Sequence, residues 1–153
     1  GIITAGNASK LADGAGCVLL ATAAAARERG FGPMAHLRDY AVVYRDPDEF
    51  NEAVPDALRR LFDRNDLAVG DIDHFEVNEA FAAQSVYVRE ELGIPEERLN
   101  PNGGAVAFGH PIGASGGMLA TTLLYALERA DDTYGVVGMS IGGGGAIAAL
   151  VER

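Results

Sequence analysis

The chain has 153 residues, a length that fits a single domain with a buried core. Its formal net charge is −10 at pH 7, from 22 acidic and 12 basic side chains. A surface of this sign argues against a nucleic-acid binder, which needs a basic patch. No apolar stretch is long enough to span a bilayer. We therefore expect neither nucleic acid nor a membrane as a partner.

Lysine is almost absent: Lys10 is the only one, and the other basic residues are arginines. No Gly-Lys-Ser/Thr sequence occurs, so there is no phosphate-binding loop of the Walker type. An acidic, lysine-poor surface stays hydrated and suits a cytoplasm rich in salt. An ordinary acidic surface is the alternative.

The two explanations of the acidic surface predict different responses to salt. If the composition is an adaptation to high salt, the melting temperature should rise as KCl increases into the molar range, because salt screens the repulsion among acidic side chains. Thermal unfolding at a series of KCl concentrations measures this. A melting temperature that gains nothing in molar KCl would favour the ordinary surface.

The rare reactive residues indicate a reducing compartment and no metal. The single cysteine, Cys17, allows no internal disulfide, and we expect a cytoplasmic protein. The histidines His36, His74 and His110 are far apart and lack metal-ligand spacing, so no metal is expected. The chain begins with Gly1 rather than methionine, which predicts a domain or processed subunit of a larger unit.

The start of the chain predicts a loop, a strand and a helix. Residues 1–16 are small and polar, as in a loop. Residues 17–22 are almost continuously apolar, which is typical of a strand buried on both faces. Residues 23–29 are strong helix formers, and Gly30 is expected to end that helix.

A second strand and a second helix are expected next. The strand lies within residues 34–44, and apolar residues at helical spacing begin at Phe50. Proline is comfortable only in the first turn of a helix. We therefore place a short turn before Pro55 and the main helix over residues 55–65.

The middle of the chain predicts a third strand at residues 72–77 and a helix at residues 79–92. Asn78 is well placed as the N-cap of that helix, and Gly93 as its end. Residues 96–115 are rich in glycine and indicate an irregular connection.

The end of the chain predicts a helix at residues 115–129 and two strands at residues 135–141 and 146–151. The glycine turn between the strands is so short that they must be antiparallel neighbours. The predicted order is βαβαβαββ. This order indicates an α/β fold in which a five-stranded mixed sheet, mostly parallel, lies between helical layers. We expect residues 1–153 to form one domain.

His110 is the first candidate for chemistry. It precedes Pro111, which forces extended backbone, and it stands in a loop surrounded by glycines. Histidine is the side chain best suited to proton transfer near neutral pH. A histidine that only holds the loop together by hydrogen bonds is the alternative.

Asn78 and Ser140 are further candidates at predicted strand ends, where α/β folds bind ligands. The Asn78 amide could donate to a developing oxyanion, directly or through water, or it could only cap a helix. Ser140 precedes four glycines whose N–H groups could form half of an oxyanion hole, although a tight hairpin also explains them. No helix follows these glycines, so they are not a dinucleotide fingerprint.

Four motifs occur together in this order: TAGNAS with DGA (residues 4–9 and 13–15), NEAF (78–81), NGGAVAFGHPIGASG (102–116) and SIGGGG (140–145). Over its full length the sequence resembles the C-terminal half of a thiolase, and NEAF favours the ordinary biosynthetic and degradative types. Thiolases join or cleave β-ketoacyl-CoA thioesters. They have two similar halves, packed in α-β-α-β-α layers. The resemblance therefore implies an N-terminal half, either fused to this chain or on another chain, that supplies the nucleophilic cysteine and most coenzyme A contacts.

The resemblance also implies a role for each motif residue. His110 would activate the cysteine and help hold the thioester oxygen, and Asn78 would orient a water in the same oxyanion hole. The Gly142 N–H would contribute to a second hole, while Ala80 and Phe81 would lie along the pocket. Acyl-CoA would be the substrate, no cofactor would be needed, and the complete unit would be a homodimer or tetramer.

Two departures from the family pattern affect these expectations. Ser140 stands where the family has the cysteine that acts as acid and base toward the second acyl-CoA. A serine hydroxyl is a far weaker acid than a thiol, so condensation and thiolysis should both suffer. Residues 50–54 read FNEAV, where many relatives carry a Met-Gly-x-Gly-Pro loop that lines the pocket.

Two hypotheses therefore stand. The chain is the C-terminal domain or small subunit of a thiolase that acts on short or medium acyl-CoA, with His110, Ser140 and Asn78 as its catalytic residues. Alternatively, it is a non-catalytic relative that binds acyl-CoA or a protein, the acid/base cysteine having been lost. A nucleotide-binding domain is disfavoured because no phosphate-loop pattern fits.

Overall fold

A four-stranded sheet forms the centre of the computed structural model, which describes residues 1–153. Its strands are β1 (His36–Tyr44), β2 (His74–Val77), β3 (Tyr134–Ile141) and β4 (Gly145–Glu152), in the spatial order β1-β4-β3-β2. β2 and β3 are parallel, whereas β4 is antiparallel to both β3 and β1. The sheet is mixed, as predicted, but mostly antiparallel, because the β3–β4 hairpin places β4 between β3 and β1.

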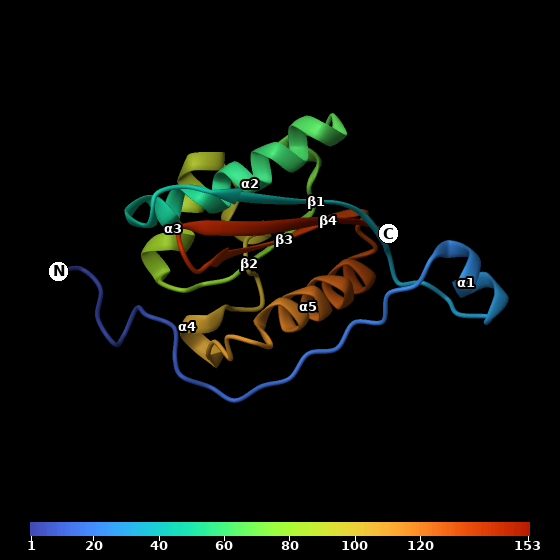
Figure 1. Ribbon diagram of the computed structural model, residues 1–153, viewed down its shortest axis with the longest axis horizontal. Coiled ribbons are helices and arrows are strands. Elements are labelled where there is room, and N and C mark those ends of the chain that lie inside the picture. The colour runs from blue at the N-terminus through green and yellow to red at the C-terminus, as the bar shows by residue number, and fades with distance from the viewer.

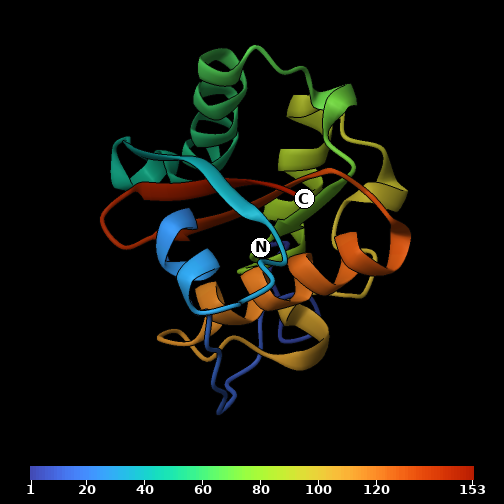
Figure 2. The ribbon, with the colours of Figure 1, turned by 90° about the vertical axis from the view of Figure 1, so that its right-hand side faces the viewer.

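Helices cover both faces of this sheet, which confirms the α/β class (Figure 1). Helix α2 (Phe50–Asn65) packs on one face together with α3 (Ala82–Leu92), and α5 (Ser115–Ala130) packs on the other. Figure 2 shows the same layers from the side. The remaining helices are short: α1 (Ala23–Glu28), α4 (Ala105–Phe108), and the 3-10 turns Pro47–Glu49, Val69–Asp71 and Glu96–Arg98. No helix is both long and apolar enough to cross a membrane.

The main core lies between α2 and the sheet. Leu58 and Leu61 of α2 and Phe75 of β2 are all fully buried there, and the rings of Phe62 and Phe75 meet edge to face with centroids 6.5 Å apart. The helical spacing seen in the sequence therefore points these side chains into one core, as predicted.

The predicted break at Pro55 is wrong, because α2 runs without interruption from Phe50. Pro55 has no N–H to donate to the carbonyl of Asn51, which costs the helix one hydrogen bond. Burial of Ala53, Val54 and Pro55 against the sheet offsets this loss.

The predicted first strand, residues 17–22, is also wrong, and the sheet has four strands instead of five. This segment crosses beneath α5, away from both sheet edges, so no strand pairs with it (Figure 1). Leu19 and Leu20 are 77% and 72% exposed. An apolar run predicts that its side chains are buried, but it does not indicate which surface covers them. In this chain no surface covers residues 17–22.

Residues 7–16, here called the N-terminal strap, run in extended form beneath α4 and α5 (Figure 1). The strap crosses α5 where Gly16 meets Gly117. A methyl group added at Gly16 would lie 2.6 Å from the carbonyl carbon of Gly117 and 2.6 Å from the nitrogen of Met118. Backbone atoms cannot rotate away, so only glycine permits this crossing.

Gly16→Ala is therefore expected to lift the strap from α5 and to destabilise the fold by roughly 1–3 kcal/mol, the usual cost of overpacking. Thermal or urea unfolding measures the change. Gly32→Ala is the matched control, because a methyl group there would meet nothing within 4 Å. Equal stability of the two variants would contradict the close crossing.

Candidate active site

Asn78 follows directly after β2 and lies at the carboxyl edge of the parallel pair β2–β3. Its backbone N–H donates to the carbonyl of Gly138 at 2.8 Å, which continues the pairing by one residue. The residue is only 3% exposed, and its side-chain amide makes no hydrogen bond within the chain. Asn78 thus brings an unpartnered amide to the edge where α/β folds bind ligands.

Asn78 does not cap a helix, contrary to the prediction. Helix α3 begins at Ala82, and Phe81 occupies its N-cap position in extended conformation. The N–H of Ala82 donates instead to the carbonyl of Asn7 at 2.9 Å. The strap therefore satisfies the start of α3, and the amide of Asn78 remains free.

The end of β2 is held from its outer side by Asn100. Its side-chain oxygen accepts from the N–H of Val77, and its side-chain nitrogen donates to the carbonyl of Val77, both at 2.8 Å. The backbone N–H of Asn100 donates to Phe75 at 2.8 Å. The side chain of Asn100 thus makes the two backbone hydrogen bonds that a paired strand would make, at the residue before Asn78. The sequence argument did not single out Asn100, although it stands just before the NGG motif.

Glu79 connects the NEAF motif to the NGGAVAFGHPIGASG motif. Its carboxylate accepts from the N–H of Val106 in the first turn of α4 at 2.9 Å, where a negative charge is favourable. A side chain at Gly104 would collide with this carboxylate. The region predicted as an irregular connection therefore contains a short helix, α4, anchored on the residue after Asn78.

His110 is fixed at its backbone and at its ring. Its N–H donates to the carbonyl of Lys10 in the strap at 2.9 Å. The preceding Gly109 has φ of +99°, a conformation that favours glycine. The ring Nδ1 lies 2.6 Å from Oγ of Ser115, the first residue of α5. Nε2 has no hydrogen-bond partner within the chain.

Asn78 and the His110 loop share one small cavity on the α5 side of the sheet. Asn78, Gly109 and Ser115 are among its lining residues, together with Phe108 and Met118. Its volume is about 10 Å³, close to the least space that holds one water molecule. The structure therefore brings the NEAF motif and the GHP motif to the same place.

Ala80 and Phe81 do not line this cavity. The carbonyl of Ala80 accepts from the N–H of Ser9 at 3.0 Å, and Phe81 forms an isolated antiparallel bridge with Ala8. Both residues are half-buried, and both are held by the strap.

Ser140 and Gly142 lie at the same carboxyl edge, at the end of β3. No hydrogen bond joins Ser140 to His110 or to Asn78. A side chain at Gly138 would face Val54 of α2, so strand alternation places Ser140 on the α2 side of the sheet. Ser140 thus approaches the edge from the face opposite to Asn78.

The glycine turn after β3 is a three-residue loop, because Ile141 pairs with Gly145. Gly143 and Gly144 have φ of +80° and +81°, which explains glycine at both positions. Gly142 is exposed, and its N–H has no acceptor within the chain. That N–H is therefore free to donate to a bound molecule.

A much larger cavity lies elsewhere, between β1 and α2, with a volume of about 470 Å³. Charged side chains of α2 line it, and Arg59 and Arg64 are already paired with Glu91 and Asp39. No motif residue reaches this cavity, so we place the candidate site at the carboxyl edge of β2 and β3.

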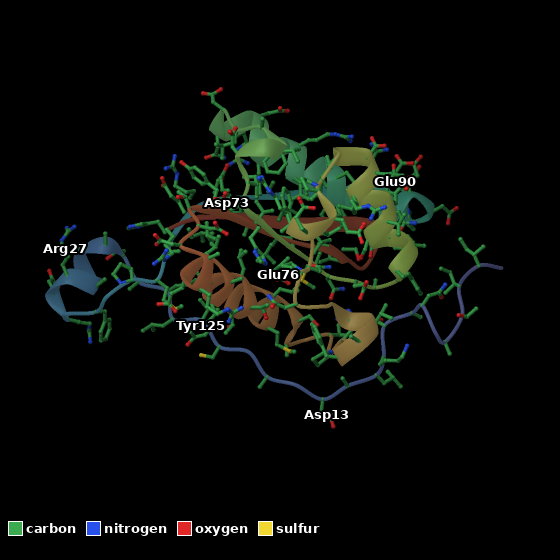
Figure 3. The ribbon with its side chains drawn as sticks, turned by 180° about the vertical axis from the view of Figure 1, so that it is seen from behind. Asp13, Arg27, Asp73, Glu76, Glu90 and Tyr125 are labelled. Atoms are coloured by element: carbon green, nitrogen blue, oxygen red, sulfur yellow. The ribbon has the colours of Figure 1, made fainter.

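Two more polar residues were missed by sequence reasoning. His74 and Glu76 of β2 are buried, with Nε2 and Oε1 3.2 Å apart. Glu76 lies between the sheet and α5 (Figure 3). Side chains alternate between the two faces of a strand, so both residues lie on the same face as Asn78. This alternation could have revealed them from the sequence. By contrast, Asp13 of the strap points into solvent, and Cys17 is exposed.

Comparison with known proteins identifies the family. A family model described as thiolase, C-terminal domain, matches residues 31–153. The chain belongs to the thiolase family. Residues 1–30 precede the matched region and contain the strap, residues 17–22 and α1.

Thiolase relatives resemble the chain beyond the matched region. It is 48% identical over 153 residues to the mouse peroxisomal 3-ketoacyl-CoA thiolase B, covering 99% of this chain and 36% of the mouse protein. It is 43% identical to the acetyl-CoA acetyltransferase of Paracoccus denitrificans, covering 100% of this chain and 39% of that protein. The chain thus spans little more than a third of the length of these thiolases.

Solved thiolase structures have the same fold. The Bacillus anthracis acetyl-CoA acetyltransferase superposes with a TM-score of 0.95 at 37% identity, over 98% of this chain and 38% of that chain. The human mitochondrial 3-ketoacyl-CoA thiolase superposes with a TM-score of 0.91 at 34% identity, over 99% of this chain and 38% of that chain.

Proposed function

We propose that this chain is the C-terminal domain or small subunit of an acyl-CoA thiolase, which is active only together with an N-terminal half that carries the nucleophilic cysteine. The observation that carries this proposal is the shared cavity of Asn78 and the His110 loop. It lies at the carboxyl edge of two parallel strands, in a chain of the thiolase family. The Asn78 amide and Nε2 of His110 both lack hydrogen-bond partners within the chain, although the ring of His110 does not itself line the cavity.

Exposed apolar side chains support a second half as partner. Tyr40 and Tyr44 of β1 are 61% and 66% exposed, on the sheet face opposite to α2, and Leu19 and Leu20 are exposed near α5. Solvated apolar groups of this size indicate a covered surface in the complete protein. The proposed partner is the N-terminal half, and the complete unit is proposed to form a dimer or tetramer.

In the proposed reaction, Nε2 of His110 accepts the proton of the partner half's cysteine thiol. The thiolate attacks the 3-keto carbon of β-ketoacyl-CoA, and the Gly142 N–H stabilises the resulting oxyanion. The bond between carbons 2 and 3 then breaks, leaving the enolate of acetyl-CoA. His110 and a water held by Asn78 stabilise the enolate oxygen.

Two transfers complete this cycle. A proton at the Ser140 position returns to carbon 2 of the enolate, which gives acetyl-CoA. Free coenzyme A then takes the acyl group from the cysteine: its thiol gives its proton to the Ser140 oxygen, and the released cysteine thiolate regains its proton from His110. Condensation runs the same steps in reverse. Ser140 is the weak point, because a hydroxyl yields its proton far less readily than the family's thiol.

Ser140 also supports a second candidate function, a non-catalytic subunit that binds acyl-CoA or a protein. Wherever acyl-CoA is the ligand, Ala80 and Phe81 are proposed to lie along its path. The single cysteine is consistent with a cytoplasmic location, which remains a proposal, since the mouse and human relatives are named as peroxisomal and mitochondrial.

The test is thiolysis of acetoacetyl-CoA by the chain fused to, or reconstituted with, its N-terminal half. The complete protein should consume acetoacetyl-CoA in the presence of coenzyme A, whereas the 153-residue chain alone should not. A complete protein that binds acyl-CoA but does not turn it over would favour the non-catalytic subunit. Turnover by the chain alone would contradict the need for a partner.

A further inference from the structure

The hydroxyl of Ser115 is buried beside the candidate base. Ser115 is 4% exposed, and its Oγ has two polar neighbours. One is Nδ1 of His110 at 2.6 Å, and the other is the backbone carbonyl of Pro111 at 3.1 Å. Both distances are within hydrogen-bonding range.

Counting hydrogens decides which atom donates in each contact. A serine hydroxyl has one hydrogen, and a carbonyl oxygen can only accept. If Ser115 donates to Pro111, then Nδ1 of His110 must carry a hydrogen and donate to Oγ. If Ser115 instead donates to Nδ1, two oxygens face each other at 3.1 Å with no hydrogen between them. Only the first arrangement makes both contacts hydrogen bonds.

The surrounding backbone keeps these atoms in place. The carbonyl of Pro111 also accepts from the N–H groups of Ala114 and Ser115, at 2.8 Å and 3.0 Å, which closes one turn at the start of α5. The strap holds His110 through Lys10 at 2.9 Å. Because both ends of the contact are anchored, Ser115 does not need a conformational change to meet the ring.

We propose that Ser115 is a positioning residue that holds neutral His110 in the tautomer with hydrogen on Nδ1. Nε2 then carries the lone pair and is the atom able to accept a proton. Acceptance of a thiol proton rests on the proposed function, whereas the tautomer follows from the contacts within this chain. The two claims can therefore be tested separately.

The direct test is the ring nitrogen spectrum of His110 in the ¹⁵N-labelled chain, at a pH above the ordinary titration range of imidazole. A nitrogen that carries hydrogen and a bare nitrogen have well-separated ¹⁵N shifts, so the spectrum identifies the tautomer. The signals of His110 are assigned by their loss in His110→Asn. We expect Nδ1–H in the wild-type chain. Nε2–H there would overturn the proposal before any serine variant is made.

Serine variants then test the cause. Ser115→Ala should shift His110 toward the Nε2–H form, which is the more stable one in free imidazole side chains, and Ser115→Thr should restore Nδ1–H. Ser85→Ala is the matched control, because the Ser85 hydroxyl is also buried but has no hydrogen-bond partner. Unchanged Nδ1–H in a folded Ser115→Ala chain would overturn the role of Ser115.

Kinetics of the complete enzyme separate this inference from the proposed function. If the chain belongs to an active thiolase, Ser115→Ala should lower kcat about 10- to 100-fold, the size of effect found when a hydrogen bond that orients a metal-bound histidine is lost, with a smaller change in KM. If Ser115→Ala changes the His110 tautomer but the complete protein has no thiolase activity, the inference about Ser115 is retained and the catalytic proposal is rejected. A kcat equal to that of Ser85→Ala in an active enzyme would overturn the inference.

Discussion

Replacing His110 with alanine in the complete enzyme is expected to lower kcat for acetoacetyl-CoA thiolysis by roughly 10²–10⁴-fold, the usual contribution of a general base. The loss should fall mainly on kcat, because the imidazole acts on charges that develop during the reaction. The backbone of residue 110 stays anchored by Lys10, so the variant should remain folded. Steady-state kinetics and unfolding curves measure both properties.

His36→Ala is the control for this experiment. His36 lies exposed at the start of β1, and it belongs to none of the motifs. Its replacement should leave kcat within about twofold of wild type, since surface changes away from special features have small effects. If His110→Ala kept wild-type turnover, proton transfer by this histidine would be rejected.

Ser140→Cys is expected to raise the condensation rate of the complete enzyme by roughly 10²-fold, in the lower part of the range for general acid–base groups. A thiol titrates near 8.5, so it can take up and return a proton at neutral pH, which a hydroxyl does very poorly. The half-buried position at the end of β3 accommodates sulfur in place of oxygen. Condensation of two acetyl-CoA molecules is the assay.

Two controls make the serine experiment informative. Ser85→Cys places a thiol at a buried position of α3 that belongs to none of the motifs, and it should not raise the rate. Ser140→Ala removes the hydroxyl and should lower any residual activity if the serine relays a proton. A rate that does not rise in Ser140→Cys would mean that another group serves as the acid and base, or that the chain is a non-catalytic subunit.

Patterns along the chain predicted the elements well where one face is buried within the chain. The spacing of Leu58 and Leu61 predicted α2, and the short glycine turn predicted the β3–β4 hairpin. Residues 17–22 failed because their apolar side chains have no covering surface in this chain. Pro55 was judged by its local cost alone, although tertiary burial decided the outcome.

Single candidate residues could be named from the sequence, but the contacts that connect them could not. His110 and Asn78 were found from their motifs, and the structure places Asn78 and the His110 loop on one cavity. The supporting bonds from Lys10, Asn100 and Ser115 join segments far apart in sequence or depend on side-chain rotamers. The spacing of apolar residues along the sequence does not predict such contacts. The N-cap prediction for Asn78 failed for the same reason, since a distant backbone carbonyl satisfies α3.

The central claim is that this chain supplies the base and the oxyanion donors, while its partner half supplies the nucleophile. Peptide mapping by mass spectrometry, after the complete enzyme is quenched with acetyl-CoA bound, tests it most directly. We predict an acetyl thioester on one cysteine of the N-terminal half and none on Cys17, which is exposed outside the candidate site. An acetyl group on Cys17, or on no cysteine of an active enzyme, would contradict the claim.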